Sequence, residues 1–239
     1  MDMTLAVLSW IAGMPRLKSL LIQPHWTCLE WEPKLLSFPP HSFAALRSLT
    51  VIFQRMENVK TLWSMPLVSN LACARVVFNH WIRYDSLEVS QFFDILVKSS
   101  PNLTTFSMAA KYEAHFFPTK LPIEIASILS SLSLGSLQLG GIQLVSSAGD
   151  VFGRIAQWWP LLRALDFDLH DHVATFDDLA IILRSFLWLD YLHLQLKPAL
   201  PPGKNVALPS VQYFSPHLAF QSHLRHLYSL SQAEKNDFA

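Results

Sequence analysis

A short pattern of apolar residues, LxxLxL, recurs along this chain and constrains its fold more than any other feature. The copies begin at Leu17, Leu46, Leu71, Leu103, Leu134, Leu162, Leu189 and Val211. Successive starts are separated by 29, 25, 32, 31, 28, 27 and 22 residues, and the last copy, VQYFSP, is weak. One match means little in a leucine-rich chain, but a series at nearly regular spacing is typical of leucine-rich repeats, whose period is roughly 20–29 residues.

Apolar residues at helical spacing form a second pattern between these motifs. Side chains at i, i+3, i+4 and i+7 lie on one face of a helix. This spacing occurs at Val89, Phe92, Phe93 and Leu96, at Ile125, Ile128, Leu129 and Leu132, at Leu179, Ile182, Leu183 and Phe186, and more loosely at Val151, Ile155 and Trp158. Ser86 is a predicted N-cap, and Asp177 and Asp178 favour the start of another helix. Each unit therefore predicts a helix, a short turn and a strand.

Such a unit cannot bury its apolar face alone, whereas stacked units can. The sequence predicts an α/β leucine-rich-repeat solenoid, an arc of about 7–8 helix–strand units with parallel strands on the concave face and helices on the convex face. We expect one domain over residues 1–239, with a capping helix in 1–14, repeats in 15–216 and a C-terminal cap and tail in 217–239. A doubly wound sheet is the alternative, but no strand precedes a glycine-rich phosphate turn.

The composition narrows the class of partner. Eighteen lysines and arginines offset eighteen acidic residues, so the chain has no electrostatic footprint for nucleic acid and no polybasic helix for a membrane surface. No apolar run approaches the roughly 18–20 residues that a membrane helix needs. Two cysteines are too few for a disulfide framework, which indicates a reducing compartment and a cytoplasmic or nuclear protein.

Three segments, SSPNLTTFSM, AQWWPLLRALDF and TFDDLAIILRSFLWLDYLHLQL, resemble the units of fungal F-box and leucine-rich-repeat proteins, in which a helix ending near WP or CP precedes LxxLxL. The likeness covers roughly Leu17 to Leu230. It implies a substrate receptor whose arc holds a ubiquitination target, while an N-terminal F-box docks a Skp-type adaptor of a cullin ubiquitin ligase. Residues 121–132, LPIEIASILSSL, resemble an F-box opening, but its Val-Cys-x-x-Trp-like continuation is missing. A Skp-type adaptor is therefore expected only if an F-box lies upstream in the full gene product.

The strand positions that alternate away from the core form the candidate site. They mix aromatic, polar and charged side chains, which suit a protein or peptide partner better than a small molecule. The predicted partner-binding residues on the concave face are Arg75, Ser107, Gln138, Asp166, Asp168, Tyr191, His193 and Gln195. Basic residues lie toward the first strands and acidic residues toward the last ones. We therefore expect a non-catalytic protein–protein interaction module.

Two alternatives remain open. The segment DFDLHDHVATFDD, residues 166–178, concentrates carboxylates and imidazoles and would suit a hydrolase or a metal-dependent enzyme, although a polar strand-to-helix turn has the same composition. No GxSxG, HExxH, CxxC or phosphate-loop motif occurs, so we expect no catalytic residue, no metal ligand and no cofactor. The second alternative is a fragment of a longer repeat protein without a role of its own.

Overall fold

The computed structural model describes residues 5–23, 38, 42–53, 55–78, 85–110, 119–140, 142–144, 148–168 and 175–194. Its main element is a parallel sheet of seven strands whose order in space follows their order in the chain. These strands are β1 (Ser19–Ile22), β2 (Ser48–Phe53), β3 (Cys73–Phe78), β4 (Thr105–Ala110), β6 (Ser136–Gly140), β8 (Ala164–Asp168) and β9 (Tyr191–Leu194). Two short parallel strands, β5 (Thr119–Leu121) and β7 (Ile142–Leu144), form a second sheet.

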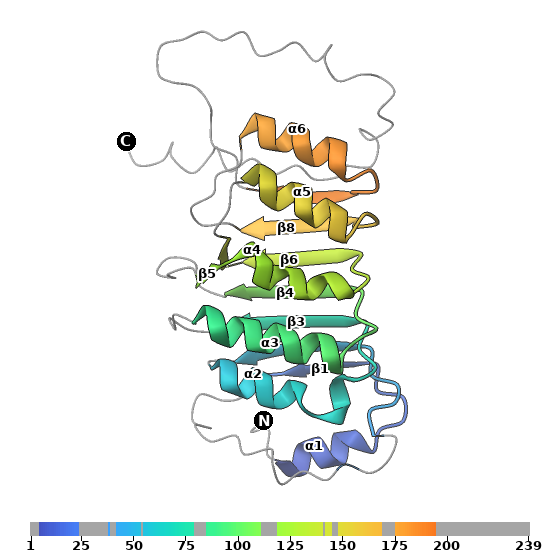
Figure 1. Cartoon of the computed structure of the whole chain (residues 1–239). Helices are drawn as coiled ribbons and strands as arrows, with labels where there is room; N and C mark the ends of the chain where they lie inside the picture. The colour runs from blue at the N-terminus through green and yellow to red at the C-terminus, as the bar shows by residue number, and fades with distance from the viewer. Residues whose placement is uncertain are drawn as a thin grey trace, which may run out of the picture.

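The helices lie on one side of the main sheet and follow the chain order of its strands (Figure 1). They are α1 (Leu5–Ala12), α2 (Met56–Trp63), α3 (Ser86–Ser99), α4 (Ile123–Ala126), α5 (Ala148–Trp158) and α6 (Phe176–Ser185), with 3₁₀ turns η2 (Pro66–Val68) and η4 (Ser127–Ser131). The predicted α/β class with parallel strands is confirmed, and the arrangement is compatible with a solenoid-like arc. No helix of the described residues combines the length and the apolar character that crossing a bilayer requires.

The strand register joins equivalent motif positions, as the sequence predicts. Residues at the third motif position pair in the series Ser19, Ser48, Cys73, Thr105, Ser136, Ala164 and Tyr191. The second motif position links each unit to the next. The Lys18 carbonyl accepts hydrogen bonds from the N–H groups of Arg47 and Ser48 at 2.9 and 3.0 Å. The carbonyls of Arg47, Ala72, Thr104, Gly135 and Arg163 accept the equivalent pair from the following unit.

The hydrophobic core lies between the sheet and the helices. At the fourth and sixth motif positions the buried residues include Leu49, Val51, Ala74, Val76, Phe106, Met108, Leu137, Leu139, Leu165, Phe167, Leu192 and Leu194. Aromatic residues fill the centre, where the Phe92 ring lies 5.4 Å from Trp63 and 6.4 Å from Phe106, centroid to centroid. The inward side chains thus share apolar character and differ mainly in size.

Two buried polar side chains tie neighbouring units together behind the sheet. The Ser100 hydroxyl donates a hydrogen bond to the Val68 carbonyl at 2.9 Å. The Trp159 indole N–H donates to the Leu132 carbonyl, also at 2.9 Å. Each buried donor is thereby satisfied by a backbone carbonyl of the preceding unit, which stabilises the packing of neighbouring units.

The helix boundaries correct the sequence prediction at α3. Asp85, rather than Ser86, is the N-cap: its carboxylate accepts the Leu87 N–H at 3.3 Å, and the Glu88 carboxylate accepts the Asp85 N–H at 3.2 Å. This reciprocal pair forms a capping box, whose second member is a carboxylate three residues after the cap. Ser86 is consequently the first residue of the helix.

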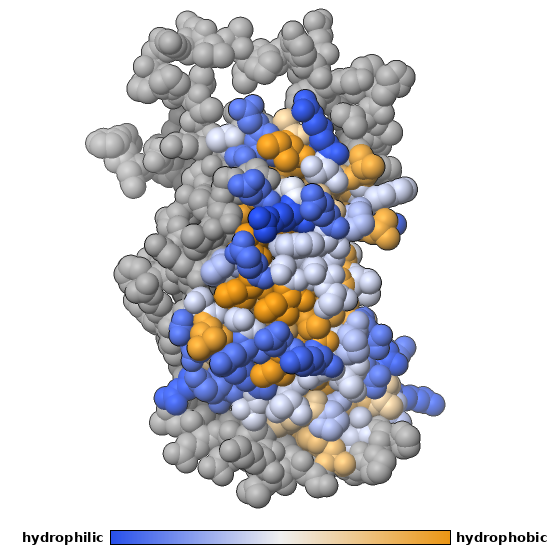
Figure 2. Space-filling view, in the orientation of Figure 1, coloured by the Kyte–Doolittle hydropathy of each residue, from blue (hydrophilic) through white to orange (hydrophobic). Residues whose placement is uncertain are grey.

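The predicted helix face at Ile125, Ile128, Leu129 and Leu132 is wrong in its periodicity. The α-helix ends after four residues and continues as a 3₁₀ turn, in which residues three apart lie one above another. The buried residues are accordingly Ile123, Ala126, Leu129 and Leu132, while Ile125 and Ile128 are only partly buried. Hydrophobic residues are visible over α4 on the helix-bearing surface (Figure 2).

Helix α5 requires a smaller correction. Val151 and Ile155 are buried as predicted, but the third core residue is Trp159 rather than Trp158, which is only partly buried. Trp159 follows the last helical residue and turns inward because its indole N–H reaches the Leu132 carbonyl. Helix α2 was not predicted from the sequence, and its buried residues are Met56, Val59, Leu62 and Trp63. The predicted eighth strand at Val211 and the C-terminal cap lie outside the described residues.

Candidate partner-binding face

The candidate site is the face of the main sheet opposite the helices, called here the open face. Its side chains come from the third, fifth and seventh motif positions, because successive residues of a strand point to opposite sides of a sheet. The fifth positions pair across all seven strands and form a continuous row: Leu21, Thr50, Arg75, Ser107, Gln138, Asp166 and His193. We call this set the fifth-position row.

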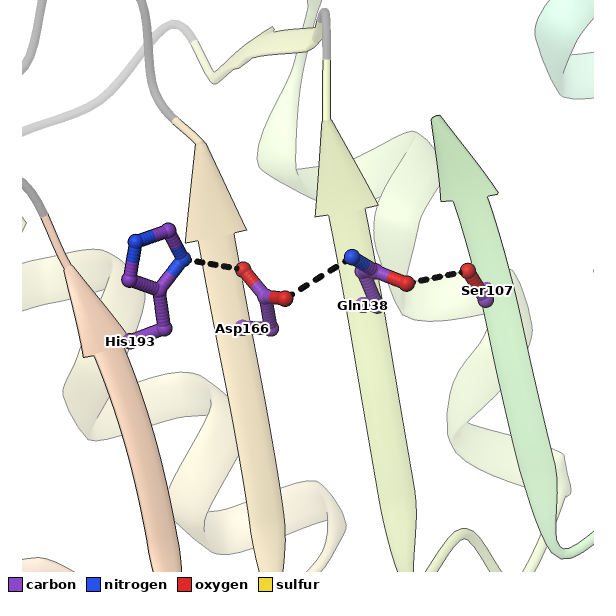
Figure 3. Close-up of polar contacts among 4 residues, drawn as sticks. All are labelled: Ser107, Gln138, Asp166 and His193. Atoms are coloured by element: carbon purple, nitrogen blue, oxygen red, sulfur yellow. Dashed lines mark hydrogen bonds and ion pairs between the residues drawn. The ribbon is translucent and has the colours of Figure 1, made fainter. Parts of the chain in front are cut away.

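Four neighbours in this row, from β4, β6, β8 and β9, are joined by hydrogen bonds (Figure 3). The Ser107 hydroxyl bonds the Gln138 side-chain oxygen. The Gln138 Nε2 donates to Asp166 Oδ2 at 2.8 Å, and His193 Nδ1 lies 2.8 Å from Asp166 Oδ1. The parallel register places one of these side chains on each adjacent strand, so each hydrogen bond spans the distance between two neighbouring strands. We call these four residues the polar relay.

The carboxylate of Asp166 determines the direction of every bond in the relay. A carboxylate only accepts hydrogen bonds, so the Gln138 amide must turn its NH₂ toward Asp166 and its oxygen toward Ser107. Ser107 is then the donor in its bond with Gln138. For the same reason Nδ1 of His193 carries the proton that Asp166 accepts. Both carboxylate oxygens are therefore engaged within the protein.

The relay leaves one imidazole atom for a partner. His193 and Asp166 retain 29% and 19% of their side-chain exposure, so the pair is accessible from the open face. With Nδ1 bonded to Asp166, Nε2 of the neutral ring is an acceptor for an N–H or O–H group. Ser107 lies three strands from His193, roughly 14 Å by the usual strand spacing. The serine is consequently too far away to act as a nucleophile activated by this histidine.

Arg75 belongs to the same row but has a different environment. Its side chain is exposed on β3, between Thr50 of β2 and Ser107 of β4. Within the described part of the chain no hydrogen bond or ion pair engages its guanidinium group, whereas Asp166 is bonded on both sides. The row thus contains one charged group whose oxygens are hydrogen-bonded by its neighbours and one that has no bonding partner within the described residues.

The remaining predicted site residues are Tyr191, Asp168 and Gln195. Tyr191 lies on the open face of β9, partly buried and already engaged by an interaction. Asp168 ends β8 beside Gly140 in register, and Gln195 lies outside the described residues. Ser107 is only 8% exposed, and its hydroxyl is hydrogen-bonded to Gln138.

The acidic residues of the segment 166–178 have different roles in the structure. Asp166 belongs to the relay, whereas Asp178 forms a capping box with Thr175 at the start of α6. Residues 169–174 lie outside the described part of the chain. Among the described residues, no group of three His, Cys, Asp or Glu side chains lies close enough to hold a metal ion.

Exposed apolar residues at the turns before β8 and β9 are a feature that the sequence analysis did not single out. Leu161, Leu187 and Trp188 are 68%, 63% and 58% exposed. A signal for them was present, because Leu161 and Trp188 each directly precede the first leucine of a motif. They lie at the end of the sheet where its strands begin, away from the relay.

No family model, curated protein or solved structure matches this chain.

Proposed function

We propose that this chain is a leucine-rich-repeat solenoid whose open face binds a protein or peptide segment without catalysing a reaction. The observation that supports this proposal most is the fifth-position row, in which four side chains from four strands are already oriented by one another. Side chains held in place before binding lose little conformational entropy when a partner arrives. A face ordered in this way is suited to recognition.

The repeated link between units supports the solenoid part of the proposal. Each second-position carbonyl accepts the same two N–H groups from the next unit, at spacings that match the motif spacing in the sequence. Each unit therefore adds one strand to the same face. Seven strands make a surface roughly 29 Å across, since six strand spacings separate the outer ones. A surface of this width suits a protein segment better than a small molecule.

The resemblance to fungal F-box and leucine-rich-repeat proteins supplies the biological setting of the proposal. The chain would be the substrate-recognition arc of a ubiquitin-ligase receptor, acting in the cytoplasm or nucleus. A Skp-type adaptor would join only through an F-box encoded upstream. Extending the reading frame in the source genome tests this setting: an upstream F-box supports it, and a complete frame without one leaves a binding scaffold alone.

Site-specific photo-crosslinking tests the binding face directly. Benzoylphenylalanine is introduced at Thr50 or Thr105 on the open face, and at Gln157 on α5 as the matched control. Thr105 and Thr50 are partly exposed and Gln157 is exposed, so all three accept a large side chain. After irradiation in cells, we expect adducts to the same protein from Thr50 and Thr105 but not from Gln157. Adducts from Gln157 alone, or none from the open face, would contradict the proposed function.

A further inference from the structure

Within the described residues the Arg75 guanidinium of the fifth-position row has no counter-ion, which indicates what kind of segment binds there. We propose that the occupant of the open face is an extended acidic peptide segment, with a carboxylate on the Arg75 guanidinium and a hydrogen-bond donor on Nε2 of His193. This inference rests on the proposed function and specifies its partner.

The charge distribution supports an acidic partner. Among the described open-face side chains, the charged groups are Arg75, Asp166 and, when protonated, His193. Asp166 already accepts hydrogen bonds from Gln138 and His193, so both of its oxygens are engaged inside the protein. Covering Arg75 with an uncharged partner would bury a cation without a counter-ion, which is strongly unfavourable. A carboxylate removes this cost and matches the forked N–H donors of the guanidinium group.

Small residues on both sides of the relay support an extended segment. On the seventh motif position β4 and β6 carry Ala109 and Gly140, and on the third position β6 and β8 carry Ser136 and Ala164. All four are partly exposed, so they form a shallow floor in the middle of the open face. Peptide backbone can approach such a floor closely, whereas a helix would touch it only through its side chains.

The separation of the two contact points sets the spacing in the partner. Arg75 and His193 lie four strands apart, roughly 19 Å along the sheet. An extended chain rises about 3.3 Å per residue, so about six residues span this distance when the segment crosses the strands. We therefore expect an aspartate or glutamate about six residues from the group that bonds His193. That group is a backbone N–H or a Ser, Thr or Asn side chain, since neutral Nε2 only accepts.

Selection from a random peptide library tests this inference. Phage displaying random twelve-residue peptides are selected on the purified full chain, and recovered peptides are measured by fluorescence anisotropy. We expect recovered sequences to be enriched in Asp or Glu. Replacing that acid by its amide, or changing Arg75→Gln, should weaken binding at least about tenfold, and making both changes should add little further loss. Arg184→Gln, an exposed arginine on α6, is the matched control and should leave the affinity unchanged.

Three results would overturn the inference: recovery of no peptide, recovery of peptides without an enriched acid, or equal affinity of the Arg75→Gln and unmodified chains. Circular dichroism of the Arg75→Gln variant shows whether it is folded, and Arg75→Lys tests the geometry. Lysine retains the charge and loses the fork, so its affinity should fall between the other two. If photo-crosslinks at Thr50 and Thr105 still identify one partner while the peptide selection fails, the proposed function stands and only the extended acidic segment is excluded.

Discussion

The two faces of the main sheet differ in the side chains that neighbouring strands place side by side. On the helix side, the fourth motif position is occupied by Leu49, Ala74, Phe106, Leu137, Leu165 and Leu192, all fully or almost fully buried. On the open face, the fifth position one residue later is occupied by Thr50, Arg75, Ser107, Gln138, Asp166 and His193. The same backbone register thus aligns apolar residues on one side of the sheet and residues with five different polar functional groups on the other.

On the proposed function, this difference assigns stability to the helix side of the sheet and recognition to the open face. An apolar side chain in the core is tolerated wherever its volume fits, because packing is not directional. The relay instead depends on matched donors and acceptors, since removing one member leaves its neighbour without a partner. Changes on the helix side should therefore alter the free energy of unfolding, whereas changes on the open face should mainly alter binding.

The largest expected effect is on the helix side of β4. Phe106 is fully buried and packs against Phe92 and Phe93, so Phe106→Ala should lower the free energy of unfolding by about 3–5 kcal/mol. Thr105→Ala, one residue earlier on the open face, is the control and should change it by about 0.5 kcal/mol or less. Urea denaturation measures both. Equal effects at the two positions would remove the distinction between the faces.

A smaller loss of stability is expected where the helix side contains a polar link. Trp159→Phe keeps an aromatic ring but removes the donor to the buried Leu132 carbonyl, at a cost of about 1–3 kcal/mol. Trp158→Phe is the matched control, because Trp158 is only partly buried and makes no such bond within the described residues. Denaturation curves that shift equally for both variants would show that the hydrogen bond contributes nothing to the stacking of units.

On the open face, Asp166→Ala should change the state of His193 more than it changes the fold. It removes two hydrogen bonds on a partly exposed group, so we expect a loss of about 1 kcal/mol. Without this acceptor, no hydrogen bond to residue 166 stabilises the Nδ1–H tautomer of the neutral imidazole. Long-range ¹H–¹⁵N correlation spectra at alkaline pH should show the Nδ1–H tautomer in the unmodified chain and a shift toward Nε2–H in the variant. An unchanged tautomer would mean that Asp166 does not orient the ring.

The smallest effect on stability is expected at Arg75. Its exposed side chain makes no hydrogen bond or ion pair within the described residues, so Arg75→Gln should alter the unfolding free energy by less than about 0.5 kcal/mol. Thermal or urea unfolding checks this value. A loss above about 1 kcal/mol would assign Arg75 a structural role and weaken its assignment to a partner.

The strand register could be predicted from the sequence because each copy of LxxLxL carries its own alignment. Leu46, Leu71, Leu103, Leu134, Leu162 and Leu189 are all buried at equivalent places. The residues of the open face follow from that alignment, since alternation along a strand is strict. Arg75, Gln138, Asp166 and His193 were predicted for this reason, and the described strands place them in one row.

The finer geometry could not be predicted in the same way. The motif assigns Ser107 to a face, but its hydrogen bond to Gln138 and its low exposure depend on side-chain rotamers that the motif does not specify. At α4 the spacing of Ile125 and Ile128 satisfied a helical period, yet the 3₁₀ turn selected every third residue. Short helical segments are ambiguous because 3.0 and 3.6 residues per turn diverge little over one turn.

The most direct test of the separation between the faces combines three open-face changes in one chain. Arg75→Ala, Gln138→Ala and His193→Ala are introduced together with benzoylphenylalanine at Thr50, and the yield of the photo-crosslinked partner is measured against the chain without the three changes. We predict a cooperatively folded protein, within about 2 kcal/mol of the original stability, that loses the adduct. A folded variant that forms the adduct in undiminished yield would contradict the claim that this row recognises the partner.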